Sequence, residues 1–371
     1  MKIAKRFEDL PPYTPIEPFE ILSKKIGIPI KDIIKLDANE NPYGPSPRAT
    51  TAISNLQYPH IYPDPESRLL RKSLSEYTKA PFENLIAGSG ADELIDLLLR
   101  VFLEPGDNVI NCPPTFGMYS FDTLINAGNV INIPRDEDFK LNIDEIEKVV
   151  HQYKPKLIFI TSPNNPDGKV VDINIIKRLL KLPVLTVLDE AYIEFAGNNN
   201  DLGSSISLIN QVKNYNNLIV LRTFSKWAGL AGLRVGYGAF PDWLLPTLWK
   251  VKQPYNINVA ASAAAIASLD DLDWLKSNIE KIKLERSRLF EKLLDFPLLS
   301  PYPSQSNFIL CKVSSIEANE LKTLLSQKGI FVRHYNTRLL KNYIRISVGT
   351  KSQTDKLMET LENLISERDL L

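Results

Sequence analysis

Cysteine and histidine are scarce in this chain of 371 residues, which contains two cysteines and three histidines. Two cysteines, Cys112 and Cys311, cannot build the disulfide framework of a small secreted domain, and they fit a reducing cytoplasm. The histidines His60, His151 and His334 do not have the spacing of zinc ligands. We therefore expect no metal site and predict a cytoplasmic protein.

An excess of charge of either sign is also lacking, because 44 lysine and arginine residues balance 44 aspartate and glutamate residues. Proteins that bind nucleic acid or acidic membranes are expected to carry a basic excess. No apolar run approaches the roughly 20 residues that cross a bilayer, and residues 1–10 lack the apolar core of a secretory signal. The composition therefore supports neither nucleic acid nor a membrane as a partner.

What the chain does contain is enough apolar material for a large core, since 44% of its residues are hydrophobic. This length and composition predict about two domains. Residues 1–47 are rich in proline, cannot form one helix, and are expected to be an extended arm. We predict that this arm joins a small domain over residues 257–371, and that residues 48–256 form a large domain.

Short apolar strands alternate with amphipathic helices through much of the large domain. The expected strands are 85–87, 108–111, 130–133, 157–160, 184–188, 218–221 and 235–239. The expected helices are 65–78, 92–103, 116–126, 144–152 and 173–180. This α/β alternation predicts a mainly parallel sheet that is covered on both faces, with ligands bound beyond the carboxyl ends of the strands.

The pattern changes near residue 257, where a smaller α+β domain is expected. Its expected helices are 260–268, 272–294, 318–327 and 354–366. Its expected strands are 308–313, 330–333 and 343–348.

The stretch 223–238 contains the most informative group of residues. Thr223 and Ser225 precede Lys226, and four glycines and Arg234 follow. Apolar neighbours favour burial of the lysine, which lowers the pKa of its amine, and a neutral amine can attack an aldehyde and form a Schiff base. The hydroxyls and the guanidinium are suited to a phosphate. A phosphate and an aldehyde on one small molecule indicate pyridoxal phosphate, whereas the alternative is a solvated lysine at a strand end.

This stretch resembles the cofactor-lysine motif of the fold-type I pyridoxal-phosphate enzymes, in particular the aminotransferases. From about Pro11 to Gly349 the chain is similar to the histidinol-phosphate aminotransferase family. The resemblance implies the fold-type I architecture, with a large cofactor-binding domain, a smaller C-terminal domain and an N-terminal arm. It also implies a homodimer with shared active sites.

Asp189 directly follows the strand 184–188, and its carboxylate would pair with the protonated pyridine nitrogen of the cofactor. The resemblance gives Asp189 the same role, whereas the alternative is an aspartate that caps the next turn. Tyr192 and Asn165 match the family residues that hydrogen-bond the phenolic oxygen of the cofactor. A core aromatic and an ordinary turn are the alternatives. Asp167 stands where the family usually has threonine.

The segment 88–93 joins a strand to a helix, and free N–H groups at the start of a helix bind phosphate. Ala91 and Asp92 align with that role in the family, and we assign the contact of Asp92 to its backbone. Phe116 aligns with the aromatic residue that stacks on the pyridine ring. Tyr62 matches the tyrosine that reaches the phosphate of the neighbouring subunit's cofactor. A glycine turn and a core aromatic are the local alternatives.

Two arginines near the C-terminus are candidates for binding the substrate anion. Arg345 lies mid-strand, on the face opposite its isoleucine neighbours, and a guanidinium fork suits a carboxylate or phosphate. The resemblance implies that Arg345 and Arg333 anchor the substrate, and that Tyr13 and Asn39 lie near it. The alternative for Arg345 is a solvated or salt-bridged strand face, and the alternative for the other three is an ordinary surface or loop residue.

The resemblance implies that Lys226 holds the cofactor covalently, then moves a proton at the substrate Cα as base and acid. In the family, histidinol phosphate gives its amino group to 2-oxoglutarate. Related enzymes that act on aromatic amino acids, or that decarboxylate threonine phosphate, remain alternatives. A transcription regulator with this fold would need an N-terminal DNA-binding module, and the proline-rich residues before the first α/β unit carry no helix-turn-helix pattern.

Overall fold

The computed structural model describes residues 2–8, 10, 16–198 and 201–368. The chain divides into two compact units. Unit 1 comprises residues 1–10, 44–165 and 170–277, and unit 2 comprises residues 11–43, 166–169 and 278–371. The domain boundaries predicted from the sequence stay a prediction. Among the described residues, no helix is both long and apolar enough to cross a membrane.

Unit 1 is built on a seven-stranded sheet with the order β2-β8-β7-β6-β5-β3-β4. Its strands are β2 Leu85–Gly88, β3 Asn108–Asn111, β4 Asn129–Asn132, β5 Leu157–Thr161, β6 Leu185–Asp189, β7 Leu218–Thr223 and β8 Gly236–Ala239. The pairs from β7 to β4 are parallel, and β8 is antiparallel to both of its neighbours. The predicted mainly parallel sheet is therefore confirmed.

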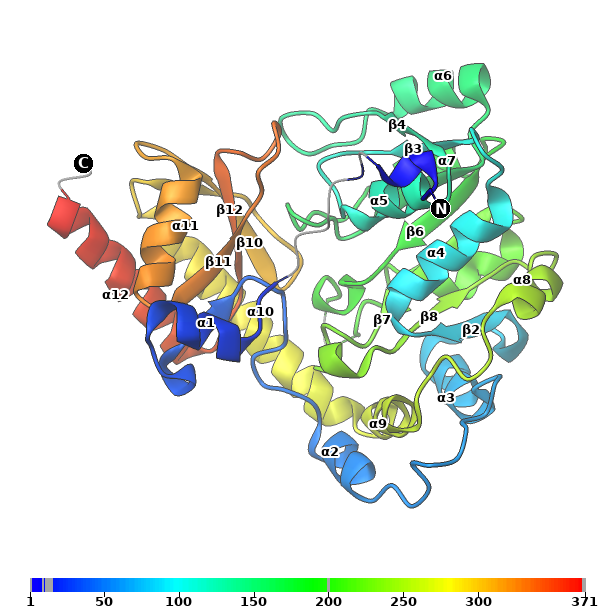
Figure 1. The fold of residues 1–371 in the computed structure, drawn as a ribbon, viewed down its shortest axis with the longest axis horizontal. Helices are drawn as coiled ribbons and strands as arrows, with labels where there is room; N and C mark the ends of the chain where they lie inside the picture. Colours follow the sequence, from blue (N-terminus) through cyan, green and yellow to red (C-terminus); the bar gives the residue numbers. More distant parts are fainter. Residues whose placement is uncertain (1, 9, 11–15, 199–200, 369–371) are drawn as a thin grey trace. The chain divides into compact units, whose positions relative to one another are not determined.

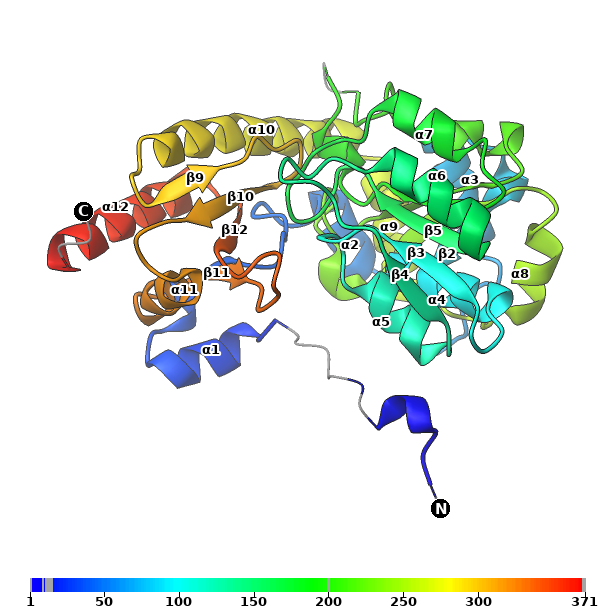
Figure 2. The same cartoon turned by 90° about the horizontal axis from the view of Figure 1, so that it is seen from above.

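Helices cover both faces of this sheet, with α4 and α5 on one face and α6 and α7 on the other (Figure 2). The α-helices of unit 1 are α2 Pro47–Ser54, α3 Arg68–Thr78, α4 Gly90–Phe102, α5 Met118–Ile125, α6 Ile143–Tyr153, α7 Ile173–Leu179, α8 Leu245–Val251 and α9 Val259–Leu269. Short 3-10 helices are η1 Lys5–Phe7, η3 Phe82–Asn84, η4 Ile193–Phe195, η5 Ile209–Asn214 and η6 Ala231–Leu233. Leucines of α4 form one core with apolar residues of β5, β6 and β7. This packing fixes the start of α4 against the sheet.

Unit 2 contains a five-stranded sheet with the order β1-β11-β12-β10-β9. The strands are β1 Ile34–Leu36, β9 Leu299–Pro301, β10 Phe308–Val313, β11 Ile330–His334 and β12 Tyr343–Ser347. The helices are α1 Phe19–Ile26, η2 Ile30–Asp32, α11 Ala318–Gln327, α12 Lys351–Arg368 and α10 Leu272–Leu294, which begins in unit 1. Ile344 and Ile346 of β12 pack in one core with α10, α11 and α12. Because side chains alternate along a strand, Arg345 lies on the opposite face.

The N-terminal segment contains more regular structure than its prolines predict. Pro18 and Pro29 stand just before α1 and η2, where a proline needs no helical hydrogen-bond partner for its nitrogen. Helix α1 ends at Gly27, whose φ of 72° is left-handed. The strand β1 pairs with β11, far along the chain, so no local pattern marks it. The sequence analysis also missed the short elements α2, α8 and β9.

The direction of the strands determines where the site lies. The strands β2, β3, β5, β6 and β7 run the same way, so their carboxyl ends share one edge of the sheet. Strand β8 runs in the opposite direction, so its first residue lies at that same edge. Ligands of such sheets bind beyond this edge.

Candidate active site

The predicted cofactor residues of unit 1 converge on the carboxyl edge of the sheet. Asp189 and Thr223 are the last residues of β6 and β7. Asp189 is level with Thr161 of β5, and Thr223 is level with Gly236 of β8. Residues that follow these strands therefore face a common space.

Lys226 lies three residues beyond β7 and its side chain is half-buried. Its neighbours in sequence, Phe224 and Trp227, are fully buried. The ring of Trp227 stacks on Tyr77 with centroids 5.4 Å apart. These aromatic contacts anchor the turn on both sides of the lysine, so its backbone is held in place.

Two hydroxyls and a guanidinium meet beside this turn. The Thr223 hydroxyl donates to Ser225 Oγ at 2.9 Å, and the Ser225 N–H donates to Thr223 Oγ1 at 3.1 Å. Arg234 Nη1 donates to Ser225 Oγ at 3.5 Å. A guanidinium and hydroxyls in one place are the donors that a phosphate requires.

The start of α4 completes this group of donors, and two glycines make room for it. Gly90 has a φ of 78°, and a Cβ there would lie 2.5 Å from Arg234 Nη2. A Cβ on Gly236 would lie 2.5 Å from the backbone nitrogen of Ala91. The first turn of α4 therefore packs directly against β8 and Arg234, and helix N-termini attract anions.

Asp92 contacts this group through its side chain, in addition to the backbone role predicted for it. Arg234 Nη2 donates to Asp92 Oδ2 at 2.7 Å, and both side chains are about half exposed. Glu93 instead has a structural role. Its carboxylate accepts hydrogen bonds from the Ser89 N–H at 2.5 Å and from Asn256 Nδ2 at 2.7 Å. Such a contact back to the residue before the helix stabilises the start of the helix.

Asp189 is buried and held by two donors. The Tyr119 hydroxyl donates to Oδ2 at 2.5 Å, and the Ala191 N–H donates to Oδ1 at 3.0 Å. Burial raises the pKa of Asp189 to about 6, against these two hydrogen bonds, which lower it. Burial, and then the nearby Asp189 carboxylate, raises the pKa of the Tyr119 phenol well above its usual value.

The sequence analysis did not predict Tyr119 or the chain of polar groups behind it. Tyr119 Oη lies 2.8 Å from Thr161 Oγ1, which lies 3.1 Å from Thr115 Oγ1. The Thr115 hydroxyl donates to Asn164 Oδ1 at 2.9 Å, and Asn164 Nδ2 donates to the Pro114 carbonyl at 3.1 Å. Two features of the sequence could have indicated these residues. Tyr119 stands three positions after Phe116, and polar turns follow β3 and β5.

Phe116, Tyr192 and Asn165 lie at the same edge. Phe116 is half-buried, and its ring meets Tyr119 edge to face at 5.5 Å with an interplanar angle of 82°. Tyr192 is 5% exposed, in the turn after β6. Asn165 is half-buried in the turn after β5, next to the fully buried Asn164. An aromatic ring, a phenol and an amide therefore follow the strands at the edge where Asp189 lies.

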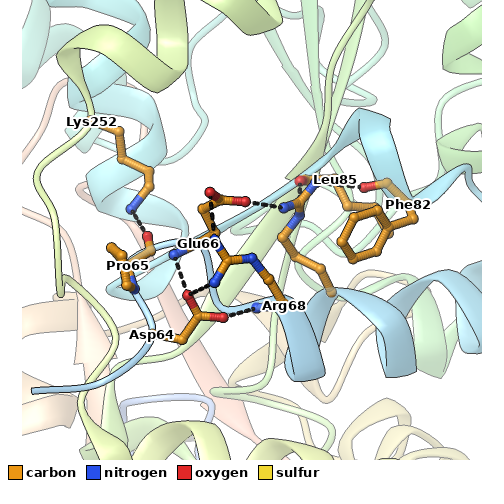
Figure 3. Close-up of polar contacts among 8 residues, drawn as sticks. Asp64, Pro65, Glu66, Arg68, Phe82, Leu85 and Lys252 are labelled. Atoms are coloured by element: carbon orange, nitrogen blue, oxygen red, sulfur yellow. Dashed lines mark hydrogen bonds and ion pairs between the residues drawn. The ribbon is translucent and has the colours of Figure 1, made fainter.

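Tyr62 differs from the other candidates because it is 79% exposed. Its ring stacks on Tyr255 with centroids 4.6 Å apart. Figure 3 shows how the loop after it is held: Asp64 accepts from the Arg68 N–H at 2.8 Å, and Lys252 Nζ donates to the Pro65 carbonyl at 3.2 Å. The loop is thus ordered although its tyrosine points outward.

Helix α3, which follows this loop, is tied to β2, the strand that precedes the predicted phosphate-binding turn. Arg71 is buried, and its Nε donates to the Leu85 carbonyl at 2.8 Å. Its Nη2 donates to the Phe82 carbonyl at 3.0 Å, and its guanidinium lies 4.0 Å from the centre of the Phe82 ring. One buried arginine therefore joins the Tyr62 loop to β2.

In unit 2, the two predicted substrate arginines lie side by side. Arg333 of β11 is directly opposite Arg345 of β12 in the antiparallel pair. Both guanidinium groups lie over the ring of Tyr335, at 5.5 and 5.8 Å from its centroid. Arg345 is 5% exposed, and its Nη2 donates to the Asp37 carbonyl at 2.7 Å. Two like charges at adjacent positions of one sheet face favour binding of an anion.

Asn39 lies on the same face of this sheet, but its polar groups bind other protein groups. Its φ of 56° is left-handed. Its N–H donates to Ser347 Oγ at 2.8 Å, and Ser347 Oγ donates to Asn39 Oδ1 at 3.0 Å. Asn307 Nδ2 donates to the Asn39 carbonyl at 2.9 Å. Asn39 thus shapes the turn beside Arg345, whereas Tyr13 lies outside the described residues.

Comparison with known proteins places the chain in a family. Residues 31–361 match the family model of aminotransferase class I and II. The chain is 52% identical over 355 residues to a chloroplastic histidinol-phosphate aminotransferase of Nicotiana tabacum, covering 95% of this chain and 84% of the relative. It is 47% identical over 363 residues to a histidinol-phosphate aminotransferase of Roseiflexus castenholzii, covering 96% of each. The chain belongs to the histidinol-phosphate aminotransferase family.

Solved structures agree with this membership of the histidinol-phosphate aminotransferase family. The structure of the Sinorhizobium meliloti histidinol-phosphate aminotransferase, in complex with pyridoxal-5'-phosphate, matches with a TM-score of 0.85 and 28% identity. That match covers 98% of this chain and 99% of the other chain. The predicted family, the fold-type I architecture and the prediction of an aminotransferase are therefore confirmed.

Proposed function

We propose that this aminotransferase moves the amino group of L-histidinol phosphate to 2-oxoglutarate, giving imidazole-acetol phosphate and glutamate in histidine biosynthesis. We propose pyridoxal 5'-phosphate as its cofactor. One observation carries the proposal: Lys226 and Asp189 lie at the same edge of the sheet as Arg234 and the two hydroxyls beside it. This set combines an amine, a phosphate site and a carboxylate.

The residues fit the cofactor by chemistry and by shape. Thr223, Ser225, Arg234 and the first turn of α4, with Ala91 and Asp92, would hold the phosphate. Gly90 and Gly236 leave no room for side chains where that turn meets Arg234 and β8, as a close approach of backbone to ligand requires. Because the Asp189 carboxylate is buried, it would favour a protonated ring nitrogen.

The remaining cofactor contacts would orient the ring. Phe116 would stack on its face, and Tyr192 and Asn165 would donate to its phenolic oxygen. When bound, pyridoxal phosphate supplies an aldehyde for the substrate nitrogen and a ring that accepts electrons. Lys226 would hold the cofactor, then take the proton from the substrate Cα and return it at the C4′ carbon of the cofactor.

The two arginines support a substrate with a phosphate monoester or a second carboxylate. The amino donor carries a phosphate and glutamate carries a carboxylate, so one site must accept both anions. Arg333 and Arg345 together offer two guanidinium forks on one sheet face. We propose that both bind the substrate anion, with Tyr13 and Asn39 beside it.

We also propose a homodimer in which Tyr62 reaches the cofactor phosphate of the neighbouring subunit. The exposed Tyr62 ring on an anchored loop supports this role. The cytoplasm remains our prediction for its location. A large domain over residues 48–256 and a small domain over 257–371 with the arm 1–47 remain our prediction for its organisation.

Two related reactions remain second candidates: transamination of aromatic amino acids and decarboxylation of threonine phosphate. The opposed arginines favour phosphorylated donors over aromatic ones. Rates with histidinol phosphate, phenylalanine and threonine phosphate, each with 2-oxoglutarate, separate the three. We expect the largest kcat/KM for histidinol phosphate. A larger value for phenylalanine would reassign the substrate and leave the transamination intact. Faster release of carbon dioxide from threonine phosphate would reassign the reaction to decarboxylation.

A lysine variant tests the catalytic proposal. Lys226→Ala should lose essentially all turnover, at least about a thousandfold, because it removes both the covalent link and the base. Lys148→Ala, at an exposed ion pair on α6, is the matched control and should keep full turnover. Full turnover in Lys226→Ala would refute the proposal.

A further inference from the structure

A row of hydroxyls, two of them buried and that of Thr115 half-buried, connects Asp189 with the turns after β3 and β5. From Asp189 Oδ2 it passes to Tyr119 at 2.5 Å, to Thr161 at 2.8 Å and to Thr115 at 3.1 Å. It ends at Asn164 Oδ1, 2.9 Å from the Thr115 hydroxyl. We call these three hydroxyls, of Tyr119, Thr161 and Thr115, the hydroxyl relay.

Both ends of the hydroxyl relay accept hydrogen bonds. Asn164 Nδ2 donates to the Pro114 carbonyl at 3.1 Å, which fixes the amide so that Oδ1 faces Thr115. Turning the amide over would bring two oxygens together at the Pro114 carbonyl. At the other end, an ionised Asp189 can only accept.

Because both ends of the row only accept, the row has one proton fewer than it has hydrogen-bond contacts when Asp189 is ionised. The row contains four contacts between its members, and each needs one proton. A hydroxyl supplies a single proton, so Tyr119, Thr161 and Thr115 supply three. The fourth can come only from Asp189. With a protonated Asp189 every group donates toward Asn164, whereas with an ionised Asp189 one contact in the row has no proton.

We propose that the residues of the hydroxyl relay are positioning residues. Their hydroxyls hold the Asp189 carboxyl, change direction with its charge and thereby influence its protonation. The relay is fully hydrogen-bonded when Asp189 carries a proton, and Tyr119 turns to donate to Asp189 when that carboxyl is ionised. This inference rests on the proposed function, in which Asp189 meets the cofactor ring nitrogen. Asp189 can then pass its proton to a basic ring nitrogen: its O–H bond breaks, an N–H bond forms, and the Tyr119 hydroxyl turns to donate to the carboxylate.

The other charged groups that act on Asp189 do not explain its preference for a proton by themselves. Asp92 on α4 and Glu190, the next residue in the chain, both disfavour a negative charge on Asp189. Each has an arginine partner, because Arg234 contacts Asp92 at 2.7 Å and Arg222 contacts Glu190 at 3.0 Å. Burial is the largest cause of the raised pKa of Asp189, and the hydrogen bond from Tyr119 lowers that pKa. In our proposal the relay limits this lowering, because Tyr119 can donate to Asp189 only if another contact in the row loses its proton.

Two substitutions should shift the pKa of Asp189 in opposite directions. Tyr119→Phe keeps the ring packed on Phe159 but removes the donor to the carboxylate, so the pKa of Asp189 should rise. Thr115→Val removes the far hydroxyl, after which Tyr119 and Thr161 can satisfy an ionised Asp189 completely. The pKa of Asp189 should therefore fall, although Thr115 is two hydroxyls away. Each shift should be about half a unit to one unit.

The measurement is carbon-13 NMR of the aspartate carboxyl groups in the cofactor-free full chain, titrated with pH and assigned with Asp189→Asn. Tyr237→Phe is the matched control, because it removes a phenol that is equally buried and contacts the Arg222 cluster instead. It should leave the Asp189 titration unchanged. Shifts of the same sign in Tyr119→Phe and Thr115→Val, or no shift in Thr115→Val, would overturn the relay.

Cofactor binding separates this inference from the proposed function. Asp189→Asn should weaken pyridoxal phosphate binding at least tenfold, and Tyr119→Phe should weaken it several-fold to tenfold. If Asp189→Asn binds as tightly as the natural protein, the pairing with the ring nitrogen is wrong. If Asp189→Asn weakens binding and Tyr119→Phe does not, the pairing stands and the relay is wrong.

Discussion

At the level of single residues, the contact between Asp92 and Arg234 bears most directly on anion binding. The same guanidinium that would hold a phosphate donates to the Asp92 carboxylate at 2.7 Å. Both side chains are about half exposed, so water screens the pair and its strength is small. The carboxylate therefore competes weakly with a phosphate for Arg234.

Removal of this carboxylate should strengthen anion binding. Asp92→Asn should tighten binding of pyridoxal phosphate and of inorganic phosphate about two- to fivefold, because a half-exposed pair contributes at most about 1 kcal/mol. Calorimetric titration of the cofactor-free protein measures both affinities. Asp96→Asn, in an ion pair with Arg100 on the same helix, is the control and should change neither. Weaker binding in Asp92→Asn would mean that the carboxylate orients Arg234 instead.

A second residue-scale feature is the buried pair of carboxylates around Arg222. Arg222 Nε donates to Glu190 Oε2 at 3.0 Å, and Arg222 Nη1 lies 3.5 Å from Glu194 Oε1. One cation thus faces two acids, all buried. Burial raises the pKa of Glu194 to about 8, against Arg222, which lowers it.

This pKa predicts how stability depends on pH. The folded state holds the Glu194 proton more tightly than the unfolded chain, so this residue lowers the stability as pH rises from about 4.5 to about 8. Glu194→Gln should abolish that loss, on the order of a few kcal/mol. Urea unfolding at pH 6 and pH 9 measures it. The control is Glu145→Gln, because the Glu145 side chain is 43% exposed. Equal losses in the natural protein and Glu194→Gln would contradict the prediction.

At the level of elements, the approach of α4 to β8 brings together the donors of the proposed anion site. A helix start can bind a phosphate only if its first turn is accessible and close to the other donors. Gly90 and Gly236 allow this closeness, since a Cβ on either would lie 2.5 Å from Arg234 or from the Ala91 backbone. The site is therefore a property of how two elements pack.

Gly90→Ala tests this packing, with Gly106→Ala as the matched control. Both glycines have a positive φ, 78° and 93°, so each substitution should cost about 1–2 kcal/mol of stability. A Cβ at Gly106 meets nothing within 4 Å, whereas one at Gly90 collides with Arg234. Cofactor affinity should fall at least tenfold in Gly90→Ala and stay unchanged in Gly106→Ala. Equal affinities would show that Arg234 moves aside without loss.

At the level of the whole molecule, the proposed homodimer would place residues of two chains in each active site. Tyr62 is exposed and stacks on Tyr255, and its loop is held by Asp64 and Lys252. Tyr62 and Tyr255 are both exposed and together form an apolar patch, and such patches mark sites of contact with a partner.

Mixing one impaired and one inactive variant tests this arrangement. Tyr62→Ala should weaken cofactor binding about tenfold, and Lys226→Ala should be inactive. In a mixed dimer of the two, one active site has both Tyr62 and Lys226, so unfolding and refolding them together should restore part of the activity. The two variants refolded separately and then combined at once are the control. Activity no greater than that control would show that Tyr62 acts within its own chain or not at all.

Local patterns predicted much of the fold. The helices α10 and α11 and the strands β3 and β10 begin and end at the predicted residues, because their apolar periodicity is uninterrupted. The predicted starts of α4 and α5 differ by two residues, where glycines allow more than one boundary. The strand β1 was missed because its partner, β11, lies far along the chain.

The sequence by itself determined the order and type of the reactive residues: a lysine after β7, an aspartate at the end of β6 and an arginine just before β8. Chain direction then places all three at one edge, since those residues lie at strand ends. Only the tertiary structure decided that Tyr119 meets Asp189, 70 positions apart, and that Asn164 meets Thr115. Such contacts depend on how a helix and two turns pack on the sheet, and side-chain packing leaves no periodic mark in the sequence.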